Sequence, residues 1–150
     1  MPQSFAKIIV HLIFSTKDRR PIIDHTWRSE LHTLLGGLVN QSGGRSVIVG
    51  GVSDHVHLLF DLGRKISIAD LVRVLKSTTT PWVTRDRAVD PTFSWQQGYA
   101  AFSVSESNIA SVTRYIAQQE EHHRIRTFQD ELREWLKKQK MEWDERYIWD

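Results

Sequence analysis

Two histidines lie two residues apart at the start of an apolar run. His55 and His57 flank Val56, and the run continues to Phe60. Such composition predicts a strand, and a strand projects alternate residues to the same face. His55 and His57 then share one face, while Val56, Leu58 and Phe60 supply a core on the other. Two imidazoles on one face can hold a single metal ion, and a metal-free pair is the alternative.

A second polar pair follows about sixty residues later in the chain. Tyr115 and Gln119 are four residues apart, which stacks them on one face of a predicted helix. At 100° per residue, this pair borders the apolar stripe of Ile109, Val112 and Ile116. A tyrosine at that border is held by the core and still reaches a cleft. Taken alone, the pair indicates only a boundary tyrosine and a surface glutamine. Together with the histidines, it predicts a metal-assisted tyrosine nucleophile.

Three neighbouring residues are candidates for supporting roles. Asp54 precedes the first histidine, where it orients an imidazole ring or serves as a turn residue. Gln118 is a rival to Gln119 as a ligand. His122 lies on the same predicted helical face as Tyr115, and we expect it to support the site from outside the ligand set.

Composition excludes several classes of chemistry. The chain has 150 residues, a net charge of +2 and no cysteine. The absence of cysteine excludes disulfides, thiol nucleophiles and cysteine-based zinc sites. The apolar stretch from Ile8 to Phe14 is interrupted by His11 and is too short to cross a membrane. We therefore expect a cytoplasmic protein with no membrane partner.

The basic residues are concentrated where the motifs lie. Residues 1–119 contain 13 Lys and Arg against 9 Asp and Glu, and residues 120–150 contain 7 against 9. A basic excess beside a candidate nucleophile predicts contacts with a phosphate backbone, and a solvated helix face is the alternative. The candidate DNA contacts are Lys17, Arg19, Arg20, Arg64, Lys65, Arg73, Lys76, Arg85 and Arg87.

Hydrophobic periodicity predicts an α+β fold. Strands are expected over 5–14, 47–49, 55–60 and 99–104, and helices after Asp24, after Ser67, after Ser105 or Ser107, and over 128–140. Pro81 should end or bend the second helix. The order matches the ferredoxin-like β-α-β-β-α-β arrangement, with appended C-terminal helices. We expect one domain, 1–150, with a core over about 5–125 and a helical, aromatic tail over 126–150.

Three segments together resemble a known family, the small single-tyrosine HUH transposases of bacterial insertion sequences and of REP-associated elements. The run from His11 to Lys17 resembles the opening strand and basic loop of the family. The run Asp54-His55-Val56-His57-Leu58-Leu59 resembles the histidine-hydrophobic-histidine strand. The run from Arg114 to His123 resembles the nucleophile helix. The order, the spacing and the total length also agree.

The resemblance implies cleavage and rejoining of single-stranded DNA at the ends of a mobile element, which the family recognises through hairpins. Tyr115 would form a 5′-phosphotyrosine bond, and His55, His57 and Gln119 would hold Mg²⁺ or Mn²⁺. The resemblance also implies a homodimer in which the tyrosine helix of one subunit reaches the histidines of the other. A related group of longer proteins acts as monomers.

The sequence leaves two functions of other classes open. One is a single-stranded nucleic-acid binding module with an idle Tyr115, in which Trp82, Trp95 and Tyr99 stack on bases or simply pack in the core. The other is a metal-dependent phosphohydrolase with no covalent step. The aromatic residues of the tail could cover the domain, support a dimer or order the site; they are Trp135, Trp143, Tyr147 and Trp149.

Overall fold

A four-stranded antiparallel sheet forms the centre of the molecule. The computed structural model describes residues 2–123 and 126–150. The strands are β1 (Ile9–Ser15), β2 (Arg45–Gly51), β3 (His55–Asp61) and β4 (Ala100–Ser103), in the spatial order β2-β3-β1-β4. The predicted α+β class and the β-α-β-β-α-β order of elements are confirmed. The first strand begins later than predicted, at Ile9, and the described residues before it are exposed.

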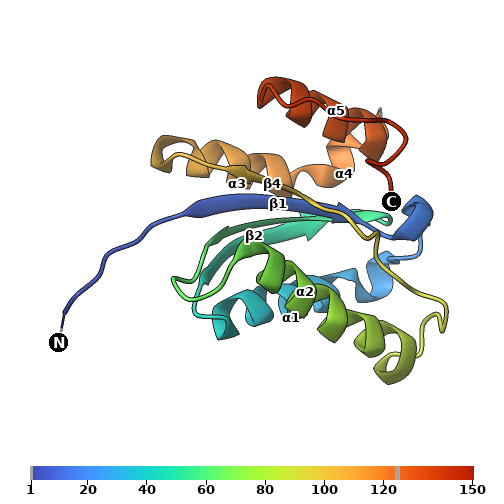
Figure 1. Cartoon of the computed structure of the whole chain (residues 1–150). Helices are drawn as coiled ribbons and strands as arrows, with labels where there is room; N and C mark the ends of the chain where they lie inside the picture. The colour runs from blue at the N-terminus through green and yellow to red at the C-terminus, as the bar shows by residue number, and fades with distance from the viewer. Residues whose placement is uncertain (1, 124–125) are drawn as a thin grey trace.

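Two helices cover one face of the sheet, which is the lower face in Figure 1. They are α1 (His25–Gln41) and α2 (Ile68–Pro81). The side chains of Asp24 and Ser67 cap them as predicted, because each accepts a hydrogen bond from a backbone N–H of the first turn. The α-helix ends at Pro81, as predicted, and a short π-helix, Trp82–Asp86, follows it directly.

Three further helices lie over the opposite face. These are α3 (Ile109–Ala117), α4 (Gln119–His122) and α5 (Phe128–Lys138). Helix α3 packs on β2 and β3, whereas α5 packs on β1 and β4 through Ile13 and Phe102. Figure 1 shows α3 and α5 on the upper side of the sheet, with α5 drawn higher than α3. The sheet face between them is where β3 places its histidines.

The helix that carries Tyr115 differs from the prediction in two ways. Neither Ser105 nor Ser107 caps it by a side-chain hydrogen bond, because a short 3-10 helix, Glu106–Asn108, leads into it. The predicted continuous helix is also wrong, because Gln118 has non-helical backbone angles (φ −104°, ψ 23°). Tyr115 and Gln119 therefore belong to two helices, α3 and α4.

A glycine sets how closely α3 approaches the sheet. A Cβ atom at Gly50 of β2 would lie 2.7 Å from the carbonyl oxygen of Ile116. Only a residue without a side chain leaves room for this backbone contact. Gly50 thus fixes the height of α3, and with it Tyr115, above the sheet.

The aromatic tail covers the sheet. Trp135, Trp143 and Trp149 pack with Ile148 against the cluster of Ile13, Phe102, Phe128, Leu132 and Leu136. Tyr147 is the exception, with 65% of its surface exposed. Of the three roles considered for the tail, these contacts support covering the domain. The Trp135 ring also meets the rings of His11 and Tyr115 edge to face, with centroids 4.8 and 5.3 Å apart, which supports a role in ordering the site. Among the described residues, no helix combines the length and apolar character that crossing a membrane requires.

Candidate functional site

The histidines of β3 lie on the sheet face beneath α3 and α5. His55 pairs with Ser15 across the β1 ladder, and His57 pairs with Ile13. Both imidazoles are completely buried. Alternation along β3 sends them to one face, as predicted, and sends Val56 to the apolar core beneath α1 and α2.

His55 is held from both sides by oxygen atoms. Its Nδ1–H donates to Asp54 Oδ1 at 2.7 Å, and its Nε2 lies 3.0 Å from Gln119 Oε1. Burial lowers the pKa of His55, but the hydrogen bonds and charges of Asp54 and Glu131 outweigh this and raise the pKa to about 9. The structure thus brings Asp54 and Gln119 to His55, each at a different ring nitrogen.

His57 contacts a histidine that sequence reasoning left without a role. His11 of β1 is fully buried, and its Nε2 lies 2.8 Å from His57 Nδ1. Burial and the neighbouring imidazole lower the pKa of His11 to about 3, and burial lowers the pKa of His57 to about 4. Both rings are therefore neutral at pH 7. The sequence signal that could have identified His11 is its position. It lies on a predicted strand that neighbours the strand of His55 and His57, and its side chain points to the same face of the sheet.

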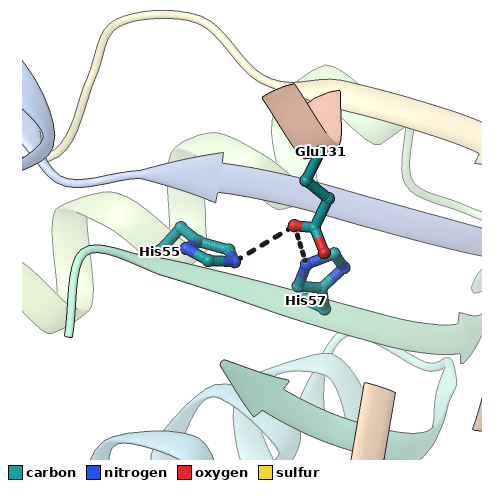
Figure 2. A group of neighbouring side chains, drawn as sticks. All are labelled: His55, His57 and Glu131. Carbon is teal, nitrogen blue, oxygen red and sulfur yellow. Dashed lines mark hydrogen bonds and ion pairs between the residues drawn. The ribbon is translucent and has the colours of Figure 1, made fainter. Parts of the chain in front are cut away.

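The largest omission of the sequence prediction is Glu131. This residue of α5 is completely buried, and its Oε1 lies 2.9 Å from His57 Nε2 and 3.2 Å from His55 Nε2. Figure 2 shows its carboxylate descending between the two rings. Burial opposes the charged form, but the close imidazoles of His123, His55 and His57 hold the pKa of Glu131 far below its usual range. The sequence signal was weak, since one glutamate in a charged helix looks like a surface residue.

The hydroxyl group of Tyr115 lies at the same carboxylate. It donates a hydrogen bond to Glu131 Oε2 and accepts one from the Arg126 guanidinium at 2.8 Å. The ring of Tyr115 stacks on His122, with centroids 4.5 Å apart, and its centroid lies 5.9 Å from that of His57. Burial and the Glu131 carboxylate raise the pKa of Tyr115 above its ordinary value. The phenol is therefore protonated in this arrangement.

The two adjacent glutamines have opposite environments. Gln119 is 2% exposed and donates from Nε2 to Glu131 Oε2 at 3.2 Å. Gln118 is exposed and forms the break between α3 and α4. The structure therefore brings Gln119 to the histidines and leaves Gln118 at the surface. The break at Gln118 turns the chain so that the Gln119 side chain points inward. The predicted continuous helix did not include this break.

Two more residues near the site were missed. His123 Nε2 lies 3.1 Å from Glu131 Oε1, and the His123 ring meets the His55 ring edge to face. Arg126 pairs with Glu134 in addition to contacting Tyr115. Both residues line a surface groove with Arg28 and Asp54, which borders the buried cluster.

The predicted DNA contacts lie in three regions, which are the loop after β1, the loop after β3, and α2 with the π-helix that follows it. Thr16, which precedes Lys17, bonds to Asp54, so the basic loop that holds Arg19 and Arg20 lies at the His55 end. Arg64 and Lys65 follow the opposite end of β3. Seven of the nine basic residues are exposed, and Arg19 and Lys76 are partly buried. The Arg19 guanidinium lies over the Trp149 ring. The Lys76 ammonium donates hydrogen bonds to the three backbone carbonyls of residues 96–98. Arg85 and Arg87 lie in and just after the π-helix, and Arg73 pairs with Asp70 on α2.

The buried cluster has the donor set of a divalent-cation site. One nitrogen from each of His55 and His57 and one oxygen of Glu131 lie within 4.8 Å of one another. Imidazole and carboxylate donors together suit Mn²⁺ and other divalent ions. Asp54 and His11 hold the far nitrogens of the two rings, which is the support that metal-binding histidines commonly have. The residues present therefore fit a cation.

Comparison with known proteins agrees with this geometry. The family model described as "Transposase IS200 like" matches residues 4–119, which span β1 through the Tyr115 helix to Gln119. The chain belongs to the IS200-like transposase family. The predicted family is thereby confirmed, and this protein is a transposase of the tyrosine type.

Individual relatives support the same assignment. The chain is 27% identical over 114 residues to the ISDra2 transposase TnpA of Deinococcus radiodurans, which covers 73% of this chain and 81% of that relative. A crystal structure of a candidate transposase from D. radiodurans R1 matches with a TM-score of 0.60 and 26% identity, covering 79% of this chain and 98% of the other.

A third solved structure shares the fold. It is a REP-associated tyrosine transposase bound to a REP hairpin, with a TM-score of 0.60 and 13% identity, covering 82% of this chain and 73% of that one. The family match ends at residue 119, so α5 and Glu131 lie beyond the part of this transposase that the family model describes.

Proposed function

We propose that this transposase cleaves and rejoins single-stranded DNA at the ends of a mobile element through a 5′-phosphotyrosine intermediate on Tyr115. The observation that carries the proposal is the position of the Tyr115 hydroxyl, which lies within hydrogen-bond reach of a carboxylate that also contacts both histidines. A tyrosine used only for packing does not require its hydroxyl at a buried cluster of two histidines and a carboxylate.

The reaction is a transesterification. The phenolic oxygen of Tyr115 attacks the scissile phosphorus, a new P–O bond to tyrosine forms, and the bond from phosphorus to the 3′-oxygen breaks. The phenolic proton is lost and the departing 3′-oxygen gains one. Because the phosphotyrosine conserves the energy of the broken bond, a 3′-hydroxyl can reverse the step without a nucleotide cofactor.

The residues around Tyr115 have opposing effects on its ionisation. Glu131 favours the neutral phenol, whereas the Arg126 guanidinium lies 2.8 Å from the phenolic oxygen and favours the phenolate. Arg126 also lines the surface groove, where it can meet a phosphate. We propose that this groove is the approach of the DNA strand to Tyr115.

His55, His57 and Gln119 are proposed to hold the divalent cation, Mg²⁺ or Mn²⁺. When bound, such a cation polarises a phosphate oxygen and neutralises charge that develops in phosphoryl transfer. Gln119 Oε1 lies 3.0 Å from His55 Nε2, so its amide oxygen is close enough to this imidazole to share a cation with it.

The proposed partners are single-stranded DNA with hairpin-forming ends and a second copy of the chain. The solved relative bound to a REP hairpin is the support for the nucleic acid. In this chain Tyr115 lies beside its own His57, which supports a site assembled within one subunit rather than shared between two. A homodimer stays a prediction and is not needed to bring these residues together.

The decisive experiment traps the covalent intermediate. End-labelled single strands taken from the DNA that flanks the gene are incubated with the protein and Mg²⁺ or Mn²⁺, and a labelled protein band is sought on a denaturing gel. We expect a band that disappears in Tyr115→Phe and on removal of metal, but persists in the control Tyr147→Phe, whose ring is largely exposed. Cleavage without an adduct would favour the phosphohydrolase, and binding without cleavage the binding module.

A further inference from the structure

The two carboxylate oxygens of Glu131 face different partners. Oε1 lies 2.9 Å from His57 Nε2, 3.2 Å from His55 Nε2 and 3.1 Å from His123 Nε2. Oε2 accepts hydrogen bonds from the Tyr115 hydroxyl and from the side-chain amide of Gln119. One carboxylate therefore spans the histidine pair and the candidate nucleophile.

The spacing of the donor atoms matches that of ligands around one ion. Ligands at about 2.1 Å from an octahedral cation lie about 3 Å from their neighbours. The separations from Glu131 Oε1 to His55 Nε2 and His57 Nε2 are close to this value. Without a cation, Oε1 accepts the N–H hydrogens that a cation would displace from these nitrogens.

We infer that Glu131 of α5 is a metal ligand that completes the site of His55, His57 and Gln119. The inference rests on the proposed function for the presence of a cation, and it adds a residue outside the segment that the family model matches. Because the other oxygen of the same carboxylate holds Tyr115, Glu131 also fixes the nucleophile beside the ion.

The packing of α5 shows that the carboxylate is built into the site. Helix α5 is anchored on β1 and β4 by Phe128, Leu132 and Leu136, which are all buried. Glu131 lies on the same buried face of α5 and has no exposed surface. A buried carboxylate is costly unless it is paired, so a fixed position among imidazoles favours a charge-balancing role.

One alternative has an opposite consequence. If Glu131 only occupies the cation's position in the metal-free protein, metal binding must expel it and loosen α5. If Glu131 is a ligand, metal binding must hold α5 more firmly. The two cases predict opposite changes in two quantities. These are the Mn²⁺ affinity of a Glu131 variant and the rate of hydrogen exchange over α5 when the wild-type protein binds Mn²⁺.

The first test is Mn²⁺ binding to the full chain, measured by isothermal titration calorimetry and by electron paramagnetic resonance of free Mn²⁺. We expect Glu131→Gln to weaken Mn²⁺ binding by at least about tenfold. The matched control is Asp130→Asn, which changes the neighbouring carboxylate on the same helix, where Asp130 is exposed and pairs with Arg133. The control should bind Mn²⁺ like the wild type.

Equal or tighter Mn²⁺ binding by folded Glu131→Gln would overturn the inference. Circular dichroism establishes whether the variant is folded. His57→Ala should lose Mn²⁺ binding whether or not Glu131 is a ligand, so it verifies that the measured ion is at this site. Binding that survives His57→Ala would place the ion elsewhere and would also overturn the inference.

The second test needs no variant of Glu131. Hydrogen–deuterium exchange of the wild-type protein is measured by mass spectrometry with and without saturating Mn²⁺. We expect slower exchange over α5, residues 128–138, when Mn²⁺ is bound. Unchanged or faster exchange there, with Mn²⁺ bound, would contradict a ligand role.

The metal-binding tests and the adduct experiment can fail independently of each other. A phosphotyrosine adduct that depends on Tyr115, with undiminished Mn²⁺ binding in Glu131→Gln, would leave the proposed function intact and reject the role of Glu131. If Mn²⁺ binding depends on Glu131 but the protein forms no adduct, the metal-ligand role of Glu131 would stand and the proposed function would be rejected.

Discussion

The two faces of the sheet are built from the same strands and have different contents. Beneath α1 and α2, β1 contributes Leu12 and Phe14 and β3 contributes Leu58 and Phe60, all within one apolar cluster. The opposite face buries His11, His55 and His57 among carboxylate, amide and phenol groups. One face therefore stabilises the fold and the other positions chemical groups.

On the face that carries the histidines, the buried apolar side chains form two separate clusters. One lies beneath α3 and contains Ile9, Leu59, Val112 and Ile116. The other lies beneath α5 and is built around Phe102. The polar site occupies the strip between them, where each ring has a hydrogen-bonding partner in addition to apolar neighbours, such as Phe128 beside His55. A sheet can thus bury polar groups when a partner from another element reaches each of them.

The largest expected effect is on the apolar face. Leu12→Ala should lower the free energy of unfolding by about 2–5 kcal/mol, because Leu12 has no exposed surface and its removal leaves a cavity. Urea denaturation followed by circular dichroism measures the loss. Mn²⁺ affinity of the folded variant should stay at the wild-type value. A parallel loss of Mn²⁺ affinity would show that the two faces are coupled.

The adjacent residue on β1 should give the reverse pattern. His11→Leu removes the partner of His57 Nδ1, which holds the ring that would bind metal through Nε2. We expect Mn²⁺ affinity to fall by about 10- to 100-fold. The free energy of unfolding should change less than in Leu12→Ala. Calorimetry and urea denaturation measure the two quantities, and unchanged Mn²⁺ affinity would remove His11 from the site.

The smallest effect concerns a histidine outside the site. Burial and the Arg28 charge lower the pKa of His32, on α1, to about 4 from 6.5. The unfolded chain then binds more protons than the folded one between these values, so stability present above pH 6.5 is lost as the pH falls. Between about pH 7 and about pH 5 the loss from this residue should be about 1–2 kcal/mol.

The difference between wild type and His32→Leu isolates this contribution from other titrating groups. Thermal or urea unfolding at each pH should show a weaker loss of stability toward low pH in His32→Leu. Equal losses in the two proteins would mean that His32 titrates normally. This difference measures the effect of burial, together with the Arg28 charge, on the pKa of an imidazole. The histidines of the site are buried as well, but they also have hydrogen-bonding partners.

Local pattern determined much of this protein. Alternation along β3 predicted that His55 and His57 share a face, because the period of a strand is fixed by backbone geometry. Side-chain capping by Asp24 and Ser67 was also predictable, since a cap depends on residues within one turn. The order and spacing of the motifs were sufficient for the family, which the match over residues 4–119 confirms.

Only the tertiary structure decided which other groups meet the histidines. His11 is 46 residues from His57 in sequence, and Glu131 is 74 residues away, so no local period relates them. The break at Gln118, which turns Gln119 inward, opposes the helical pattern of its own segment. Contacts of this kind depend on how α5 and α3 pack on one sheet face, and packing is a property of the whole chain rather than of any segment.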